Sequence, residues 1–254
     1  MTTRKKSTAA RRTRSTRATK RAAAPLPSAA TARDFSRRLR TWFKRHGRDL
    51  PWRQTRDPYR VLVSELMLQQ TQVSRVIDFY HRFLDRFPTL HHLAESPQEH
   101  VLEAWAGLGY YARARNLHAL ARTVTRDGGG SLPSDPAALR ALPGVGAYTA
   151  GAVASFAFER RAELVDTNVA RVLARVFAPS RSPKRPRDLT QLWRIAEAVL
   201  PARGPAAWTH NQAIMELGAV VCTARVRACG RCPVATLCLT RAADRVRMDE
   251  HPGR

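Results

Sequence analysis

The 254-residue sequence lacks the features that mark several large classes of protein. No apolar run approaches the roughly 18 residues of a membrane-spanning helix, so we expect no membrane partner. The start has no apolar signal region, which argues against secretion and leaves a cytoplasmic, nucleoid-associated location as the default. No stretch alternates apolar and polar residues between turn signals, as half-buried strands do. The sequence therefore predicts an all-α protein.

Acidic residues are scarce, with 20 Asp and Glu against 44 Lys and Arg and a net charge of +24. The first 30 residues hold nine of the basic residues and no acidic one. This segment has no hydrophobic periodicity and predicts a disordered basic arm, although an organelle transit peptide has a similar composition. The excess of positive charge indicates a polyanionic partner. Nucleic acid is the first candidate and an acidic membrane surface the second.

The remaining chain shows helical periodicity throughout and predicts about ten helices joined by short loops. We expect residues 31–221 to form the helical core, with an inner lobe at about 57–177 and an outer lobe built from the flanking helices. Residues 222–238 contain all four cysteines and form a separate loop, followed by a tail at 239–254. A monomer is the default oligomeric state.

Glu65 stands among valines, leucines and a methionine in the stretch "VSELMLQQTQV". Asp57-Pro58 is a good cap and first-turn pair for a helix, and helical spacing puts Glu65 on its apolar side. Burial disfavours the carboxylate anion, so the pKa of Glu65 should rise. A carboxyl group that holds a proton near neutral pH suits a general acid. The alternative is a glutamate paired with a nearby arginine.

A tight turn is predicted at residues 142–148, in the stretch "LPGVGAYTAGAVASFAF". Gly144 and Gly146 permit positive φ angles and a close backbone approach, and a helix follows directly. The unpaired N–H groups of a helix N-terminus bind phosphate well. The segment matches the helix-hairpin-helix of DNA-binding proteins, in which hairpin carbonyls often also hold a monovalent cation. An ordinary turn between helices is the alternative.

Asp166 precedes the helical stretch "TNVARVLARVF" and is predicted to cap it. Hydrogen bonds to a capping carboxylate favour its charged form, so we expect Asp166 to stay ionised. One carboxyl group pushed towards neutrality and one kept anionic would divide acid and electrostatic roles within a single site.

The four cysteines follow the spacing Cys222-x6-Cys229-x2-Cys232-x5-Cys238. Because intracellular chains rarely use disulfides, a metal site is favoured. A zinc ribbon usually has two C-x2-C pairs, and this run has one. Four closely spaced thiolates favour a [4Fe–4S] cluster, with zinc as the alternative.

Taken together, these segments resemble the MutY branch of the helix-hairpin-helix DNA glycosylases, related to endonuclease III. The resemblance runs in order from about Arg48 to Cys238 and covers "SELMLQQTQV", "GLGYYARARNLH", "LPGVGAYTAGAVASFAF", "VDTNVARVLAR", "MELGAVVC" and the cysteine run. It implies a two-lobed helix-hairpin-helix glycosylase fold with a C-terminal four-cysteine iron–sulfur loop. It also implies excision of adenine from double-stranded DNA that carries a mispaired or oxidised base.

By this resemblance, Glu65 is the general acid that protonates the adenine, and Asp166 stabilises the oxocarbenium-like sugar. Tyr148 occupies the position at which bifunctional relatives carry a lysine nucleophile. A tyrosine forms no Schiff base, so a monofunctional enzyme is expected. Tyr148 and Asn168 would support Asp166 through hydrogen bonds.

The resemblance also assigns binding roles. Gln70 and Tyr110 match residues that wedge the duplex open, although composition alone would make them a surface glutamine and a core tyrosine. Residues that match the lining of the adenine pocket in some members are Arg48, Trp52, Arg53 and Gln212. Trp52 is equally compatible with a plain core position.

Two departures from the family pattern affect what we expect. Thr167 in "VDTN" replaces the glycine of many bacterial members and is similar to the endonuclease III branch. The chain ends 16 residues after Cys238, whereas many MutY-type proteins continue into a domain that senses 8-oxoguanine. We therefore expect weaker recognition of the opposite base, with the basic arm adding only salt-sensitive phosphate contacts.

Two other hypotheses stay open at this point. The first is a glycosylase for T or U opposite G, because branches of the same superfamily also keep the hairpin tyrosine, the aspartate and the four cysteines. The second is a non-catalytic iron–sulfur DNA-binding protein, which would need neither Glu65 nor Asp166.

Overall fold

The computed structural model describes residues 24–127 and 129–250. Residues 1–23 of the predicted basic arm and the end of the predicted tail lie outside the described residues. The predicted end of the arm at residue 30 is wrong, because Ser28 caps α1, which begins at Ala29. The described residues form α-helices and short 3₁₀ turns, with no strand among them, and this confirms the all-α prediction. None of these helices is both long enough and apolar enough to cross a lipid bilayer.

Helices α1–α12 make up most of the described chain, and three 3₁₀ turns lie at Pro51–Arg53, Cys229–Arg231 and Ala235–Leu237. The helices are α1 (Ala29–His46), α2 (Pro58–Leu68), α3 (Val73–Arg86), α4 (Leu90–Glu95), α5 (Gln98–Ala104), α6 (Ala112–Asp127), α7 (Pro136–Arg140), α8 (Ala147–Phe158), α9 (Thr167–Phe177), α10 (Pro186–Val199), α11 (Gly204–Val220) and α12 (Leu239–Glu250).

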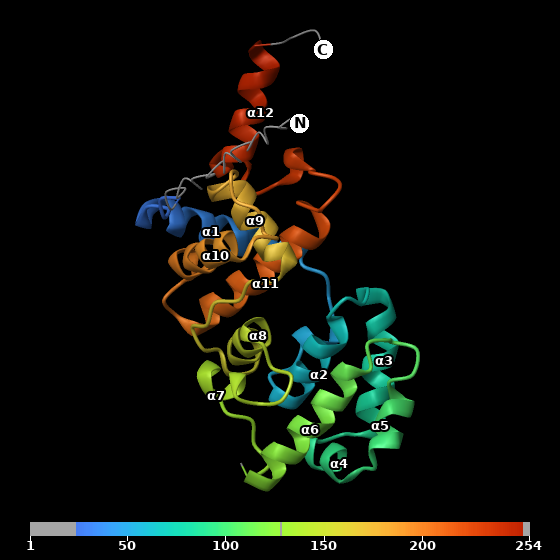
Figure 1. The fold of residues 1–254 in the computed structure, drawn as a ribbon. Coiled ribbons are helices and arrows are strands. Elements are labelled where there is room, and N and C mark those ends of the chain that lie inside the picture. Colours follow the sequence, from blue (N-terminus) through green and yellow to red (C-terminus); the bar gives the residue numbers. More distant parts are fainter. Residues whose placement is uncertain (1–23, 128, 251–254) are drawn as a thin grey trace, which may run out of the picture.

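The helices form two lobes, visible in Figure 1 as the lower and upper halves of the molecule. In one lobe α2 packs against α3, α6 and α8, while α4 and α5 cover α6, and α7 covers α8. In the other lobe α1 packs on α10 and α11, and α9 packs on α10, α11 and α12. Contacts between α8 and α11 join the lobes. The structure thus groups α9 with the outer helices, whereas the sequence placed residues up to about 177 in the inner lobe.

Helix α2 lies at the centre of the inner lobe, and every residue from Tyr59 to Met67 except Arg60 is buried. As predicted, Asp57 caps its N-terminus by accepting hydrogen bonds from the backbone N–H groups of Tyr59 and Arg60. Because α3, α6 and α8 pack around this helix, a polar side chain on most of its positions is removed from water. Glu65 is such a side chain.

The hairpin at residues 142–146 joins α7 to α8 and contains two glycines with different roles. Gly144 has φ +73°, and a Cβ atom there would lie 2.5 Å from the Cβ of Asn116. Gly146 caps α8 at φ −85°, and a Cβ atom added to it would meet open space. Of the two glycines predicted to permit a positive φ in this turn, Gly144 adopts one and Gly146 does not.

This difference between the two glycines predicts that an alanine substitution destabilises the protein more at one of them than at the other. We expect Gly144→Ala to lower the free energy of unfolding by about 1–3 kcal/mol, because it adds a clash to a left-handed backbone. Gly146→Ala should change it by less than about 0.5 kcal/mol. Urea unfolding of both variants measures the difference, and equal losses would contradict this account of the turn.

Candidate active site

Glu65 projects from α2 into the space between the lobes and is only 4% exposed. Burial raises the pKa of Glu65 to about 7; a hydrogen bond from Tyr148 opposes this rise, and the nearby Asp166 adds to it. The Tyr148 hydroxyl donates that bond to Oε2 over 2.6 Å. The structure gives Glu65 no ion pair with an arginine among the described residues. The expectation that the pKa of Glu65 is raised is therefore confirmed. The alternative, a Glu65 paired with a nearby arginine, is wrong.

Asp166 caps α9 as predicted, with Oδ1 accepting a hydrogen bond of 2.6 Å from the Val169 N–H. The side-chain amide of Asn168 donates to Oδ2 over 3.1 Å, which is the hydrogen bond expected of Asn168. Burial nevertheless raises the pKa of Asp166 above its ordinary value, although these hydrogen bonds act in the opposite direction. The hydrogen bonds favour the charged form as expected, but burial outweighs them, and an ionised Asp166 stays a prediction.

Tyr148, on the first turn of α8, contacts Glu65 rather than Asp166. Its hydroxyl donates a hydrogen bond to Glu65 Oε2, and Met215 Sδ lies 3.9 Å from the Tyr148 hydroxyl oxygen. The predicted hydrogen bond from Tyr148 to Asp166 is therefore wrong. Burial and the two neighbouring carboxyl groups hold the pKa of Tyr148 well above its usual range, so the phenol stays a donor.

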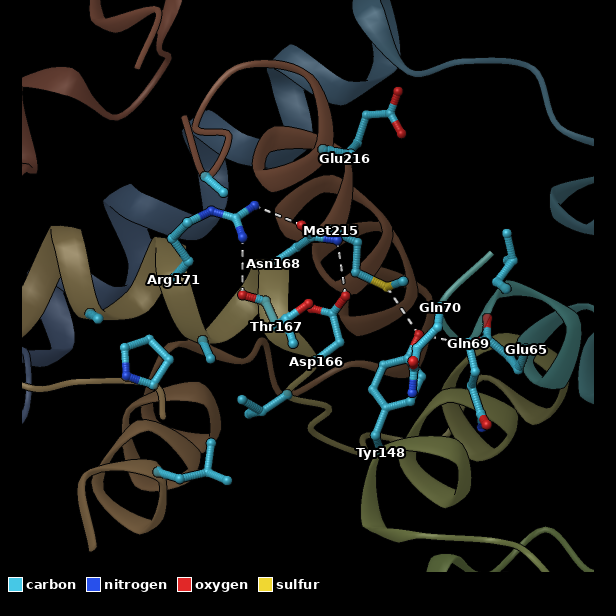
Figure 2. A pocket seen from close by; sticks show the side chains of 18 of the residues that line it. Glu65, Gln69, Gln70, Tyr148, Asp166, Thr167, Asn168, Arg171, Met215 and Glu216 are labelled. Atoms are coloured by element: carbon cyan, nitrogen blue, oxygen red, sulfur yellow. Dashed lines mark hydrogen bonds between the residues drawn. The ribbon is translucent and has the colours of Figure 1, made fainter. Parts of the chain in front are cut away.

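One cleft of roughly 1390 Å³ holds all these groups, and Figure 2 shows Glu65 and Tyr148 facing Asp166 across it. The cleft is larger than the roughly 300–1,000 Å³ of a typical small-molecule site. Other predicted site residues that line it are Arg48, Trp52, Arg53, Gln70, Gly144, Gly146, Asn168 and Gln212. Trp52 also packs edge-on against Tyr80 at 5.6 Å, so it serves the core and the cleft together.

Glu216, on α11, is a buried carboxylate in the cleft that the sequence prediction missed. Arg48 Nε lies 2.7 Å from its Oε1, and Arg53 Nη2 lies 2.9 Å from its Oε2. Burial alone would raise the pKa of Glu216, but the hydrogen bonds from the two arginines outweigh it and lower the pKa. Arg53 Nε also donates to Gln212 Oε1 over 2.8 Å. The signal was present in the sequence, because Glu216 interrupts an apolar helix just as Glu65 does.

The two predicted wedge residues both adopt a left-handed backbone, with φ 56° at Gln70 and 51° at Tyr110. Tyr110 is 58% exposed, so the alternative of a core tyrosine is wrong. Side chains other than glycine occupy this region at a cost in free energy, and such residues cluster at functional sites. Their backbone geometry was not visible in the sequence.

Comparison with known proteins agrees with this site. Residues 63–197 match the model of the HhH-GPD superfamily base excision DNA repair proteins. The chain belongs to this superfamily. It is 45% identical over 231 residues to adenine DNA glycosylase of Rattus norvegicus, covering 86% of this chain and 44% of that protein. It is 44% identical over 215 residues to adenine DNA glycosylase of Mycobacterium tuberculosis, covering 83% and 69%. The chain thus spans less than half of the rat relative.

Solved structures with the same fold include a thymine-DNA glycosylase and endonuclease III. A thermostable thymine-DNA glycosylase superposes with a TM-score of 0.77 and 32% identity, covering 84% of this chain and 98% of that one. A non-covalent endonuclease III–DNA complex superposes with a TM-score of 0.70 and 25% identity, covering 87% and 100%. The two-lobed glycosylase fold expected from the sequence is confirmed.

In this HhH-GPD chain, two arginines tie α9, the helix capped by Asp166, to the cysteine loop. Arg171 Nη2 donates to Asn168 Oδ1 over 2.6 Å and to the Gly218 carbonyl over 2.7 Å, and its Nε donates to the Cys222 carbonyl over 2.9 Å. Arg175 Nη1 donates to the Thr223 carbonyl over 2.7 Å. A chain of hydrogen bonds therefore runs from Asp166 through Asn168 and Arg171 to the first cysteine, which the sequence did not indicate.

The four cysteines of this HhH-GPD chain line one small cavity, of about 30 Å³, between the loop, α9 and α11. They are Cys222, Cys229, Cys232 and Cys238, and none forms a disulfide. In the described part of the chain, no three Cys, His, Asp or Glu side chains have the grouping of ligands for a single metal ion. The spacing prediction is thus supported to the extent that the four thiols surround a common space.

The raised pKa of Glu65 has a consequence for stability. A carboxyl group whose pKa rises from 4.5 to about 7 on folding stabilises the fold fully only below its unfolded pKa. This stability, roughly 3 kcal/mol, is lost as pH rises through the folded pKa. We therefore expect the free energy of unfolding of Glu65→Gln, relative to wild type, to increase between about pH 4.5 and pH 7.5.

Urea titrations at several pH values measure this difference, and groups common to both proteins cancel. Tyr148→Phe is the second variant, because removing a bond that favours the ionised carboxylate should move the transition to higher pH. If the free energies of unfolding of wild type and Glu65→Gln changed in parallel with pH, the pKa of Glu65 would not be raised by folding.

Proposed function

We propose that this chain is a monofunctional DNA glycosylase that hydrolyses the N-glycosidic bond of adenine mispaired with guanine or 8-oxoguanine. The observation that carries the proposal is the pair of carboxyl groups in one cleft, Glu65 with a pKa of about 7 and Asp166 at the start of α9. The identity of 44–45% to adenine DNA glycosylases of rat and Mycobacterium tuberculosis supports adenine as the base.

In the proposed reaction an extruded adenosine nucleotide enters the cleft. Protonated Glu65 donates its proton to a ring nitrogen of the adenine, so the C1′–N9 bond breaks with its electron pair moving to the base. The sugar becomes cationic, and the carboxylate of Asp166 stabilises this charge. Water adds to C1′, and its proton passes to Glu65. The products are free adenine and an abasic site.

Tyr148 and Asn168 orient the two carboxyl groups in this reaction. The phenol fixes Glu65 through the 2.6 Å hydrogen bond, and the amide of Asn168 holds Asp166. A phenol forms no Schiff base with the sugar. The enzyme is therefore proposed to stop at the abasic site and to leave the strand intact.

DNA binding is proposed for the face that contains the cleft and the hairpin. The first N–H groups of α8 have no side-chain cap, so they are available to a phosphate. Arginines line the cleft at positions 48, 53, 171 and 175. Gln70, which also lines the cleft, and the exposed Tyr110 are proposed to fill a vacated base position. A monovalent cation at the hairpin, a monomeric state and a nucleoid location remain predictions.

A glycosylase for thymine or uracil opposite guanine is the second candidate, favoured by the likeness to a thymine-DNA glycosylase at 32% identity. The two candidates differ in what the acid must do. Adenine leaves readily once a ring nitrogen is protonated, and Glu65 suits that step.

The test is an excision assay on duplexes that each carry one A:8-oxoguanine, A:G, U:G or T:G pair, with abasic sites cleaved by alkali. We expect excision of adenine and a rate that falls about tenfold per pH unit above pH 7, as Glu65 loses its proton. Glu65→Gln should bind the duplexes and lose about 100-fold or more in rate.

The controls separate the candidates. Borohydride trapping should fail for the wild type, because no amine forms an imine with the sugar. Excision confined to U or T would replace the first candidate with the second, and binding without any excision would favour a non-catalytic DNA-binding protein. An undiminished rate for Glu65→Gln would remove the role proposed for that residue.

The four cysteines are proposed to hold a [4Fe–4S] cluster, with the thiolate sulfurs as its ligands. The donor set fits, because four thiols of one loop surround one cavity. A bound cluster would supply a structural cross-link here, holding the loop against α9 and α11. Arg171 and Arg175 would carry that restraint to α9, the helix that Asp166 caps.

Cys232→Ser tests the cluster. We expect the purified wild type to show a broad absorbance near the blue end of the visible spectrum and to contain iron, and the variant to lose both together with stability. Thr236→Ser, on the same loop, is the matched control and should keep the absorbance. A colourless wild type that contains zinc would contradict the proposal.

A further inference from the structure

Arg113, in the first turn of α6, is a buried cation without an acidic partner among the described residues. Its side chain is surrounded by oxygen atoms, and the whole residue is 7% exposed. Its Nη1 donates to the carbonyls of Leu66 and Met67, each at 2.8 Å, and also to the carbonyl of Gln69. Its Nη2 donates to the Gly109 carbonyl at 3.0 Å, with Leu108 and Thr71 oxygens at 3.3 Å. One guanidinium therefore contacts two separate loops.

These acceptors explain why a positive charge lies at this place. A cation in the first turn of a helix faces the positive end of its own helix dipole. Leu66 and Met67 belong to the last turn of α2, whose carbonyls lack helical partners and carry negative charge. Arg113 thus caps the C-terminus of α2, the helix that carries Glu65. The planar guanidinium can donate hydrogen bonds to several acceptors at once.

The two loops held by Arg113 are those that carry the left-handed residues. Gln70, with φ 56°, directly follows Gln69, whose carbonyl accepts from Nη1. Tyr110, with φ 51°, directly follows Gly109, whose carbonyl accepts from Nη2. An unfavourable backbone conformation persists only where its surroundings fix it. Arg113 fixes both, and it does so through the peptide unit directly preceding each residue.

The aromatic ring of Tyr110 is held by the same group. The Arg113 guanidinium lies 5.3 Å from the centre of the Tyr110 ring and 5.4 Å from that of Trp105. Trp105 in turn donates from Nε1 to the Gly109 carbonyl over 3.2 Å. Tyr110 is exposed and yet oriented, which is the state that a side chain needs to enter a base stack without first losing rotamer freedom.

We propose that Arg113 is a positioning residue that sets the spacing of Gln70 and Tyr110, so that both enter the duplex together during nucleotide extrusion. This inference rests on the proposed glycosylase function. Arg113 does not touch the reacting atoms. It acts on the extrusion step through the two loops, and the proton transfer by Glu65 is unchanged once the nucleotide is in the cleft.

The test compares Arg113→Lys, which keeps the charge but loses the fork, with Tyr110→Ala and the double variant. Arg122→Lys is the matched control, because Arg122 is an exposed arginine on the same helix. Unstacking is followed by the fluorescence of 2-aminopurine placed beside the mismatch, a signal that needs no base excision. Single-turnover excision is measured on an A:G duplex and on the same adenine opposite an abasic site, where extrusion is easier.

We expect Arg113→Lys to reduce the fluorescence change and to slow excision from the A:G duplex about tenfold to hundredfold. The defect should shrink to less than about threefold opposite the abasic site, and the pH dependence should stay that of the wild type. In the double variant Arg113→Lys/Tyr110→Ala, the two reductions in excision rate should not multiply, because both substitutions disable the same step. Arg122→Lys should behave as the wild type in every measurement.

Equal slowing on both duplexes, or losses that multiply in the double variant, would show that Arg113 only stabilises the fold. Circular dichroism detects whether Arg113→Lys unfolds at the assay temperature. If it does, the double-mutant comparison is made at a lower temperature, with Gln70→Ala as the second substitution in the Arg113→Lys background. A wild type that unstacks the neighbouring base but excises no adenine would refute the proposed function and leave the role of Arg113 testable by fluorescence. An unchanged fluorescence signal in Arg113→Lys would overturn that role.

Discussion

The site depends on the removal of one carboxyl group from water. Glu65 lies on α2, which is enclosed by α3, α6 and α8, and burial raises its pKa to about 7. Buried Glu65 accepts a hydrogen bond from the phenol of Tyr148. The packing of the inner lobe therefore maintains the acid, and any change that admits water to α2 would lower its pKa.

Glu65 and Glu216 show how the same sequence pattern leads to opposite chemistry. Both interrupt an apolar helix and both are buried. Glu216 receives hydrogen bonds from Arg48 and Arg53, which lower its pKa, whereas Glu65 receives one from a neutral phenol. The arginines come from the segment between α1 and α2, far from Glu216 in sequence. Burial sets the penalty for a charge, and the partner that tertiary folding supplies decides whether the charge persists.

The cleft is a product of the two-lobed arrangement. Glu65 and Tyr148 come from the inner lobe, and Asp166 comes from the start of α9, which packs with the outer helices. Arg171 and Arg175 connect α9 to the cysteine loop, and Arg113 connects the end of α2 to the loops that carry Gln70 and Tyr110. The groups at the edge of the cleft are thus held by arginines that use backbone carbonyls as acceptors. This arrangement fixes loop conformations without adding acidic residues to the proposed DNA-binding surface.

The sequence by itself determined the helical class, the cap at Asp57, the burial of Glu65, the cap at Asp166 and the clustering of four thiols, because each follows from spacing along the chain. Helical periodicity reports which side of a helix is apolar, and capping is a contact over a few residues. Tertiary structure alone decided that Tyr148 bonds to Glu65 and not to Asp166, and that α9 joins the outer lobe. It also decided that Glu216 is charged, that Gln70 and Tyr110 are left-handed, and that burial raises the pKa of Asp166. These properties depend on residues distant in sequence, which determine the local dielectric environment and the hydrogen-bond partners, and no pattern within a single segment contains that information.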